Sequence, residues 1–144
     1  MVKTKRNVVI GFLGTTLERV TSEKRHRMWR PTVSLVKQDA LAIDRIELLS
    51  SSHFEGLANL IAADVRDLSP KTQVRFFSFD VDDPWKLEDV YGALFEFAEN
   101  YPFDLENEDY FVHITTGTHI AQICLFILVA DGFIPAKLMQ SSHG

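Results

Sequence analysis

The stretch from residue 109 to residue 132 reads DYFVHITTGTHIAQICLFILVADG and contains two of the elements that decide the fold. Its beginning, 110–114, is a short apolar run with β-branched residues, which is typical of a buried strand. Its end, 120–130, is apolar on almost every side apart from Gln122, which indicates a buried helix. Two histidines, three threonines and one glycine lie around the junction between these two elements. A ligand-binding site is one physical reason for polar residues at such a place.

Apolar strands and amphipathic helices continue to alternate in the rest of the chain. Apolar residues recur at helical spacing in 52–70, which has a serine N-cap and Pro70 beyond its end, and in 83–101, which has Pro84 in its first turn. The residues expected on these two apolar faces are Phe54, Leu57, Leu60, Ile61, Val65 and Leu68, and Leu87, Val90, Tyr91, Leu94, Phe95 and Ala98. We expect strands over 7–13, 45–50, 73–81, 110–114 and 136–141, and further helices over 31–38 and 117–131.

The order of these elements is β-α-β-α-β-α-β-α-β, which predicts a parallel sheet covered by helices on both faces. The predicted fold class is therefore α/β, with a doubly wound, mostly parallel, Rossmann-like sheet in a single domain over 1–144. Ligands of such sheets bind beyond the carboxyl ends of the strands, at the point where the strand order reverses. With the common order 3-2-1-4-5, the first and fourth strands are neighbours at that point.

The two junctions that this strand order brings together are both rich in glycine and threonine. The residues concerned are Gly14, Thr15 and Thr16 after the first strand, and Thr116, Gly117, Thr118 and His119 after the fourth. Glycine lets a ligand approach the backbone, helix N-terminal N–H groups attract anions, and hydroxyl and imidazole groups add hydrogen-bond donors. We interpret the two junctions as one ligand-binding site. In the alternative interpretation, Gly117 relieves a tight turn and Thr116 or Thr118 caps the helix; for His113 we favour a purely structural role in its strand.

Known catalytic, cofactor and metal motifs do not occur in this sequence. The segment GFLGTTLER lacks the third glycine of the dinucleotide fingerprint, and neither GxxxxGK[ST] nor GxSxG is present. The five histidines do not have the spacing of metal ligands, and the single cysteine, Cys124, lies in an apolar segment and is typical of a core residue. We therefore expect no catalytic residue, no metal ion and no cofactor.

The composition indicates a cytoplasmic domain that does not enter a membrane. With 144 residues and 46% hydrophobic content, the chain is able to form one real core. One cysteine excludes an internal disulfide and fits a reducing compartment. The longest apolar run, 123–130, is far too short to span a bilayer, and the basic N-terminus has no small-residue cleavage site of a signal peptide.

Charge is unevenly distributed along the chain, whose net charge is −5. The stretch 18–30 carries five basic and two acidic residues, whereas 80–109 contains eleven of the twenty acids and only one lysine. Overall acidity argues against a broad nucleic-acid-coating surface but leaves room for one local anionic site. The possible RNA contacts in the basic stretch are Arg25, Arg27, Trp29 and Arg30. A solvated loop is the simpler interpretation of the charges in this stretch. For Trp29, a position in the core or at an interface is at least as compatible with the sequence as stacking on a base.

Three blocks, VVIGFLGTTLER (8–19), WRPTVSLVKQDALAIDRIELL (29–49) and EDYFVHITTGTHIAQICLFILVADGFIPAKLMQSS (108–142), resemble sensor domains of the CARF family, the CRISPR-associated Rossmann-fold ligand sensors. The similarity is to the CARF domain at the N-terminus of a sigma-54-dependent transcription activator that controls an RNA repair operon. The resemblance implies a regulatory domain that restrains an attached ATPase domain until it binds a signal. The resemblance also implies that this signal is an RNA end, such as RNA with a 2′,3′-cyclic phosphate, and that the ligand contacts are the seven glycine, threonine and histidine residues of the two junctions.

Related CARF domains form two-fold dimers and bind cyclic oligoadenylates, and some cleave them as ring nucleases. The resemblance therefore leaves an alternative function, a ring nuclease, which we rank second because neither junction contains a lysine. A homodimer is also expected because the segment 120–130 is more apolar than one flank of a small sheet requires. In the alternative interpretation, this helix is simply central and covered by its neighbours.

Overall fold

In the computed structural model, which describes residues 4–14, 22–38 and 41–141, five parallel strands form one sheet in the order β3-β2-β1-β4-β5. The strands are β1 (Arg6–Phe12), β2 (Arg45–Ser50), β3 (Gln73–Ser78), β4 (Glu108–His113) and β5 (Lys137–Met139). The α/β class, the parallel sheet and the reversal of strand order between β1 and β4 are confirmed.

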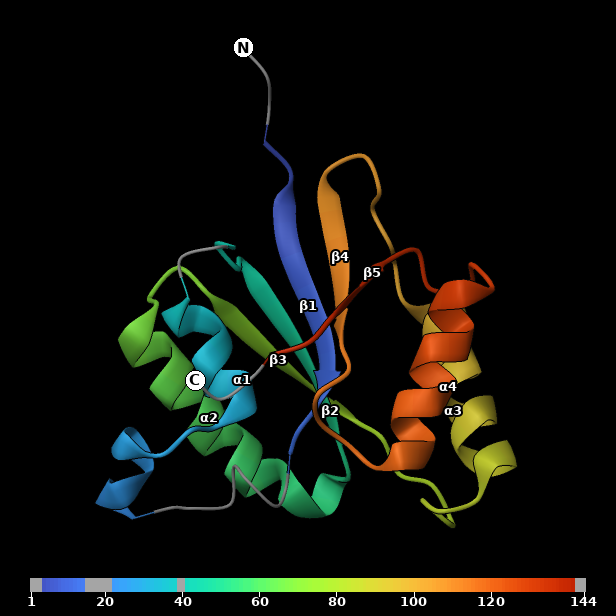
Figure 1. Cartoon of the computed structure of the whole chain (residues 1–144), viewed down its shortest axis with the longest axis horizontal. Coiled ribbons are helices and arrows are strands. Elements are labelled where there is room, and N and C mark those ends of the chain that lie inside the picture. The colour runs from blue at the N-terminus through green and yellow to red at the C-terminus, as the bar shows by residue number, and fades with distance from the viewer. Residues whose placement is uncertain (1–3, 15–21, 39–40, 142–144) are drawn as a thin grey trace.

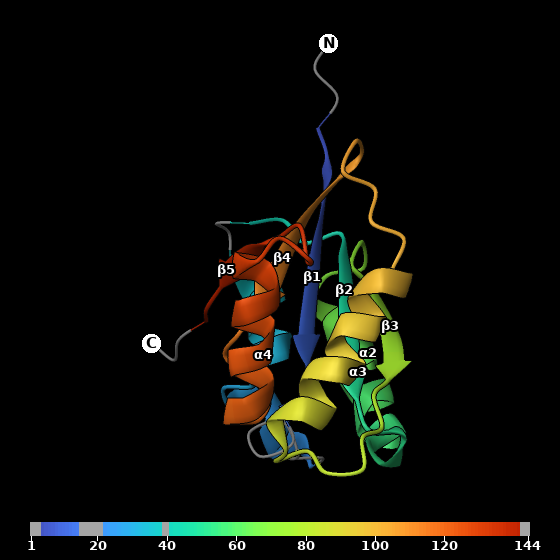
Figure 2. The same cartoon turned by 90° about the vertical axis from the view of Figure 1, so that its right-hand side faces the viewer.

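Helices cover both faces of the sheet, as Figures 1 and 2 show. On one face lie α1 (Pro31–Ser34), which continues into a 3₁₀ turn (Leu35–Lys37), and α2 (Glu55–Leu68). On the other face, α3 (Leu87–Asn100) and α4 (His119–Ala130) lie side by side. Two further 3₁₀ helices span Glu23–Arg27 and Ser52–Phe54.

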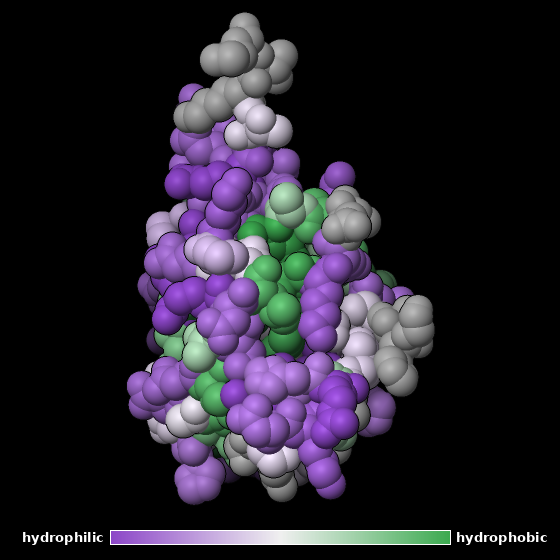
Figure 3. All heavy atoms as spheres, turned by 90° about the vertical axis from the view of Figure 1, so that its left-hand side faces the viewer, coloured by the Kyte–Doolittle hydropathy of each residue, from purple (hydrophilic) through white to green (hydrophobic). Residues whose placement is uncertain are grey.

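Alternation of side chains along the strands divides the core into two layers. Val8 and Ile10 of β1 point toward α3 and α4, whereas Val9, between them, packs with α1 and α2. Each of these three side chains is almost completely buried, and burial of one such residue contributes about 1.5–3 kcal/mol. Figure 3, which views the side of α1 and α2, shows a mostly hydrophilic surface with a narrow hydrophobic strip.

The start of α3 differs from the prediction. The Asp-Pro pair was expected in its first turn, but the helix begins at Leu87. Asp83 instead closes a separate turn, because its carboxylate accepts a hydrogen bond from the Trp85 N–H (3.0 Å) and its carbonyl accepts one from the Lys86 N–H (3.1 Å). Leu87, at the helix end rather than over the core, is 47% exposed, and Leu68, the last residue of α2, is exposed for the same reason.

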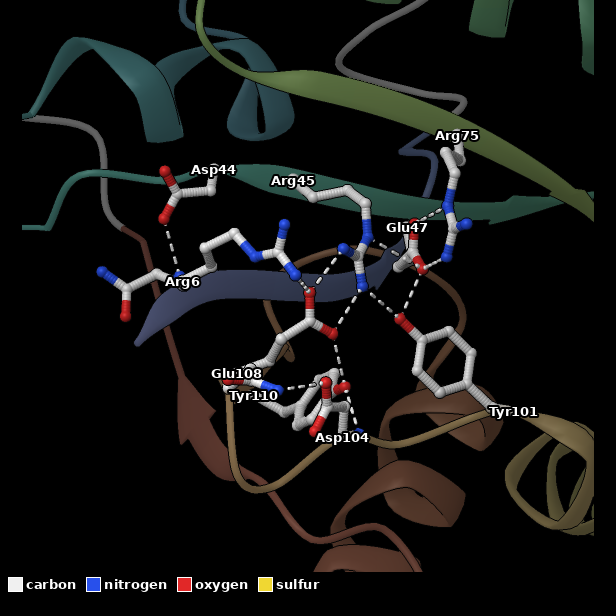
Figure 4. A network of polar contacts seen from close by, with 11 residues as sticks. Arg6, Asp44, Arg45, Glu47, Arg75, Tyr101, Asp104, Glu108 and Tyr110 are labelled. Atoms are coloured by element: carbon white, nitrogen blue, oxygen red, sulfur yellow. Dashed lines mark hydrogen bonds and ion pairs between the residues drawn. The ribbon is translucent and has the colours of Figure 1, made fainter. Parts of the chain in front are cut away.

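A network of polar side chains connects the strands near their amino ends (Figure 4). Arg45 donates to both carboxylate oxygens of Glu108 (2.6 and 3.0 Å), and Glu47, fully buried in β2, accepts from Arg75 and Tyr101. Hydrogen bonds from Arg45 lower the pKa of Glu108 to about 2. The network satisfies buried charges within the sheet and lies at the opposite end of the strands from the predicted ligand site.

Candidate ligand-binding site

The structure places the two glycine- and threonine-rich junctions against each other. β1 and β4 pair up to Gly11 and His113, and both chains then leave the sheet at the same edge. The Thr116 hydroxyl donates to the Phe12 carbonyl (2.6 Å), which links the two junctions directly. This use of the Thr116 hydroxyl is structural, and the side chain is buried.

Gly117 has the backbone conformation that a glycine requires, with φ at +92°. A Cβ atom at this position would lie 3.2 Å from the Cβ of Phe12, so the backbone also passes close to that side chain. The tight-turn role of this glycine is therefore confirmed. The Gly117 N–H has no acceptor among the described residues, which leaves this donor open to a ligand.

The N-terminus of α4 offers further donors beside that glycine. Thr118 is the N-cap, and its hydroxyl oxygen accepts from the Ala121 N–H (3.1 Å) while its hydroxyl proton stays available. Within the described part of the chain, the N–H groups of His119 and Ile120 have no acceptor, as expected for the first turn of a helix. The exposed His119 ring lies at the same end. Anions bind at such an arrangement because N–H groups and the helix dipole act together.

Two neighbouring side chains hold this turn in place. Gln122, the polar exception in the apolar helix, donates to the carbonyls of Gly117 (3.2 Å) and Thr116 (3.5 Å). Thr115 is tied to the C-terminal segment, because its hydroxyl oxygen accepts from the Ser141 N–H (2.8 Å). Both contacts fix the turn rather than offer groups to a ligand.

His113 is a structural residue of β4, as its strand position predicted. The side chain is 1% exposed, and its Nε2 lies 2.8 Å from the Ser141 hydroxyl. Burial lowers the pKa of His113 to about 4, so the ring is neutral at pH 7.

A cavity of about 760 Å³ opens beside the two junctions. Its volume falls within the usual range for small-molecule sites. The described residues that line it are Phe12, Leu13, Gly14, Ser50, Ser51, His53, Phe54, Phe79, Asp80, Val81, Pro84, Trp85, Val90, Thr115, Thr116, Gly117, Thr118, His119 and Ala121. Five of the seven predicted ligand contacts are in this lining; Thr15 and Thr16 lie outside the described residues.

The cavity extends further than the sequence predicted, over the ends of β2 and β3. Ser51 and His53 follow β2, and Asp80 and Trp85 follow β3. The prediction that 73–81 is one strand concealed this, because β3 ends at Ser78 and the next residues form the cavity wall. Because all parallel strands end at the same edge of the sheet, the predicted strand order also implies that the residues after β2 and β3 lie beside the two junctions.

The described part of the basic stretch, 22–30, does not form one exposed cationic surface. Arg30 is 2% exposed and donates to Asp64 of α2 (2.6 Å), which contradicts the prediction that it is a possible RNA contact. Arg25 also donates to that carboxylate (2.9 Å), whose pKa the two guanidinium groups hold below its usual value. Arg27 is exposed and Trp29 is half-buried, and neither lines the cavity.

The described ranges contain neither a metal-binding cluster nor a membrane-spanning helix. No cluster of three or more His, Cys, Asp or Glu side chains there is arranged to hold a metal ion. None of the described helices has the length and hydropathy to cross a membrane.

Sequence comparison gives a family for almost the whole chain. Residues 5–144 match the family described as Regulator of RNA terminal phosphate cyclase, RtcR. The chain is 42% identical over 139 residues to the transcriptional regulatory protein RtcR of Escherichia coli (strain K12). That alignment covers 96% of this chain but only 26% of the relative, so the chain spans about a quarter of that protein.

Two solved structures share the fold at low sequence identity. Csm6 from Enterococcus italicus, bound to cyclic hexa-2′-fluoro-hexa-dAMP, has a TM-score of 0.63 at 15% identity, covering 97% of this chain and 35% of Csm6. Can2 from Sulfobacillus thermosulfidooxidans, in complex with cyclic tetra-adenylate, has a TM-score of 0.58 at 11% identity, covering 95% and 32%. These similarities confirm the Rossmann-like fold that the resemblance to CARF domains implied.

Proposed function

The chain belongs to the RtcR family of regulators of RNA terminal phosphate cyclase, and we propose that it is the ligand-sensing domain of such a regulator. Its ligand is an RNA end that carries a 2′,3′-cyclic phosphate. The single observation that carries this proposal is the cavity at the N-terminus of α4, where open N–H groups, the Thr118 hydroxyl and the His119 ring converge. The domain binds and does not cleave.

The charge of the cavity supports a cyclic phosphate rather than an open one. No lysine or arginine is present among the described residues of the lining, so binding depends on neutral donors and the helix dipole. A cyclic phosphodiester carries one negative charge, whereas an open monoester carries about −1.5 to −2 at pH 7. Neutral donors compensate the smaller charge better. In the full-length regulator, binding relieves the restraint that this domain places on an ATPase domain.

The test is a titration of the purified chain with short RNAs that differ only in the 3′ end: 2′,3′-cyclic phosphate, 3′-phosphate or hydroxyl. The cyclic end should bind most tightly, and His119→Ala should weaken that binding roughly 10- to 100-fold if the ring donates to the phosphate. His26→Ala, an exposed histidine outside the cavity lining, is the matched control. Equal binding of all three ends would contradict the proposal.

Cyclic oligonucleotides are the second candidate ligand, because both solved structures with this fold contain one. The same titration should therefore include cyclic tetra- and hexa-adenylate, followed by analysis of the products. Tight binding without cleavage would make the domain a cyclic oligoadenylate sensor. Conversion to linear products would instead establish the ring nuclease.

We propose that the chain is a cytoplasmic homodimer whose subunits meet through α4. Two large apolar side chains of this helix, Ile123 and Phe126, are 48% and 53% exposed, although the helix packs well on its inner side. A two-fold contact buries the same patch on both subunits. Light scattering at micromolar concentration should give the mass of a dimer, and Phe126→Asp should give a monomer. A monomeric parent chain would contradict this.

A further inference from the structure

The cavity has an aromatic half that phosphate binding does not use. The rings of Phe12 and Phe79 meet edge to face, with centroids 5.1 Å apart, and both line the cavity. Trp85 also lines it and is 67% exposed, which is unusual for the largest apolar side chain. Aromatic side chains in nucleic-acid sites stack on bases, and such stacking tolerates any base. This half fits a flat, apolar ring.

One carboxylate lies in the same half of the cavity. Asp80 is exposed and lines the wall after β3, and its Oδ1 accepts from the Ser51 hydroxyl (3.1 Å), the Ser52 N–H (2.9 Å) and the Ser52 hydroxyl (3.2 Å). Its Oδ2 receives no hydrogen bond from the described residues. The backbone and serine donors lower the pKa of Asp80, so the group is ionised at neutral pH. The carboxylate is thus held in place by one oxygen and open at the other.

The two ends of the cavity have opposite electrostatic character. Donors and the positive end of the helix dipole lie at the start of α4, which follows β4, whereas the negative charge of Asp80 follows β3, which β1 and β2 separate from β4 in the sheet. A phosphate near Asp80 would be repelled, whereas a hydrogen-bond donor there would be attracted. The complementary ligand is therefore anionic at one end, aromatic in the middle and donor-bearing at the other end. A nucleotide has this pattern.

We propose that the aromatic half binds the terminal nucleobase and that Asp80, through Oδ2, selects a base with an amino group. This inference rests on the proposed function, because the phosphate fixes the nucleotide at the start of α4. Adenine, cytosine and guanine each present an amino group to a carboxylate. Uracil has two carbonyl oxygens beside its single N–H, and these repel the carboxylate. Asp80 is a specificity-determining residue at the wall, and Trp85 stacks on the base.

The test uses the four nucleoside 2′,3′-cyclic monophosphates, titrated calorimetrically into the 144-residue chain. The adenosine, cytidine and guanosine compounds should bind about tenfold or more tightly than the uridine compound, the scale of one charge-assisted base contact. Asp80→Asn keeps an oxygen for the serine donors but offers an N–H₂ group to the base, so it should abolish or reverse this preference. Asp82→Asn removes the same charge next to the cavity lining and should leave the preference unchanged.

The outcomes separate this inference from the proposed function. If the parent chain binds all four compounds equally, or if Asp80→Asn keeps the parent's order, base selection by Asp80 is wrong while phosphate sensing survives. If none of the compounds binds at millimolar concentration, phosphate sensing fails and base selection fails with it. His119→Ala should weaken all four compounds by the same factor, because it acts on the shared phosphate.

Tryptophan fluorescence checks the stacking separately. The chain has two tryptophans, and Trp29→Phe leaves the indole of Trp85 as the one reporter. Adenosine 2′,3′-cyclic phosphate should quench its emission on binding, and Trp85→Phe in the otherwise unchanged chain should remove the quenching. Binding without any change in the emission of Trp85 would show that the base lies elsewhere.

Discussion

The Thr116 hydroxyl donates a 2.6 Å hydrogen bond to the Phe12 carbonyl, across 104 residues of sequence. Phe12 also lies close to Gly117, and its ring meets the ring of Phe79 edge to face. The last residue of β1 therefore belongs to both halves of the cavity. A change at this contact should alter the phosphate end and the base end together.

Thr116→Val should destabilise the chain by about 1–3 kcal/mol, because valine keeps the shape but leaves the buried Phe12 carbonyl without its donor. Thr116→Ser, which keeps the hydroxyl, should lose much less. Urea unfolding of the two variants measures the difference. If valine and serine give equal stability, the hydrogen bond does not hold the junctions together.

Gly117→Ala should be more destabilising than Gly132→Ala. Both glycines have positive φ, at +92° and +82°, so each alanine pays a conformational penalty of about 1–2 kcal/mol. The Cβ of the first would also press on Phe12 at 3.2 Å, whereas the second has nothing within 4 Å. Thermal unfolding should show the larger loss for Gly117→Ala, and equal losses would mean that the close approach to Phe12 is unimportant.

The sequence predicted the sheet, its strand order and the pairing of β1 and β4. Hydrophobic periodicity identifies each strand and helix, and the alternating order of these elements is compatible with few parallel-sheet topologies. It also predicted that Gly117 and His119 follow β4 at the carboxyl edge of the sheet, where the cavity opens. The sequence did not predict the role of Gln122, whose side chain donates to the carbonyls of the turn. A single polar residue in an apolar helix does not indicate which group its side chain contacts.

The sequence also did not predict which charged residues far apart in the chain form ion pairs. Arg30 reads as part of a basic loop, but in the structure its guanidinium lies against Asp64, 34 residues away, and is buried. No periodicity connects the two positions. The same holds for Asp80, because its open carboxylate oxygen depends on serines that follow a different strand.

Asp64→Asn should lower the free energy of unfolding by about 3–5 kcal/mol, the usual loss when one partner of a buried ion pair is removed. The variant would leave the guanidinium of Arg30 buried without a counter-charge. Asp67→Asn removes the same charge from an exposed position on the same helix and should change stability by less than about 0.5 kcal/mol. Similar losses for both variants would mean that overall charge, not the buried pair, is responsible.

Stability should decrease as the pH falls from 6.5 to 4.5, and His113 should be the main cause. Burial lowers its pKa from 6.5 to about 4, so in this range the unfolded chain binds a proton that the folded chain excludes. The contribution of His113 to the free energy of unfolding is therefore fully present above pH 6.5, and below this pH it declines by at most about 1.4 kcal/mol per pH unit. Glu108, whose pKa is lowered from 4.5 to about 2, contributes most of its loss below this window.

Urea unfolding at pH 7.0, 6.0, 5.5 and 5.0 measures the slope, and His113→Gln is the variant that tests its origin. Glutamine does not titrate, and its amide is able to keep a hydrogen bond to the Ser141 hydroxyl that His113 contacts at 2.8 Å. The variant should be less stable than the parent at pH 7 because its side chain fills the site less well, but its stability should change little across the window. His26→Gln, on an exposed histidine, should keep the parent's slope. A parent chain with no slope, or a His113→Gln variant with the parent's slope, would show that proton exclusion at His113 does not govern stability in this range.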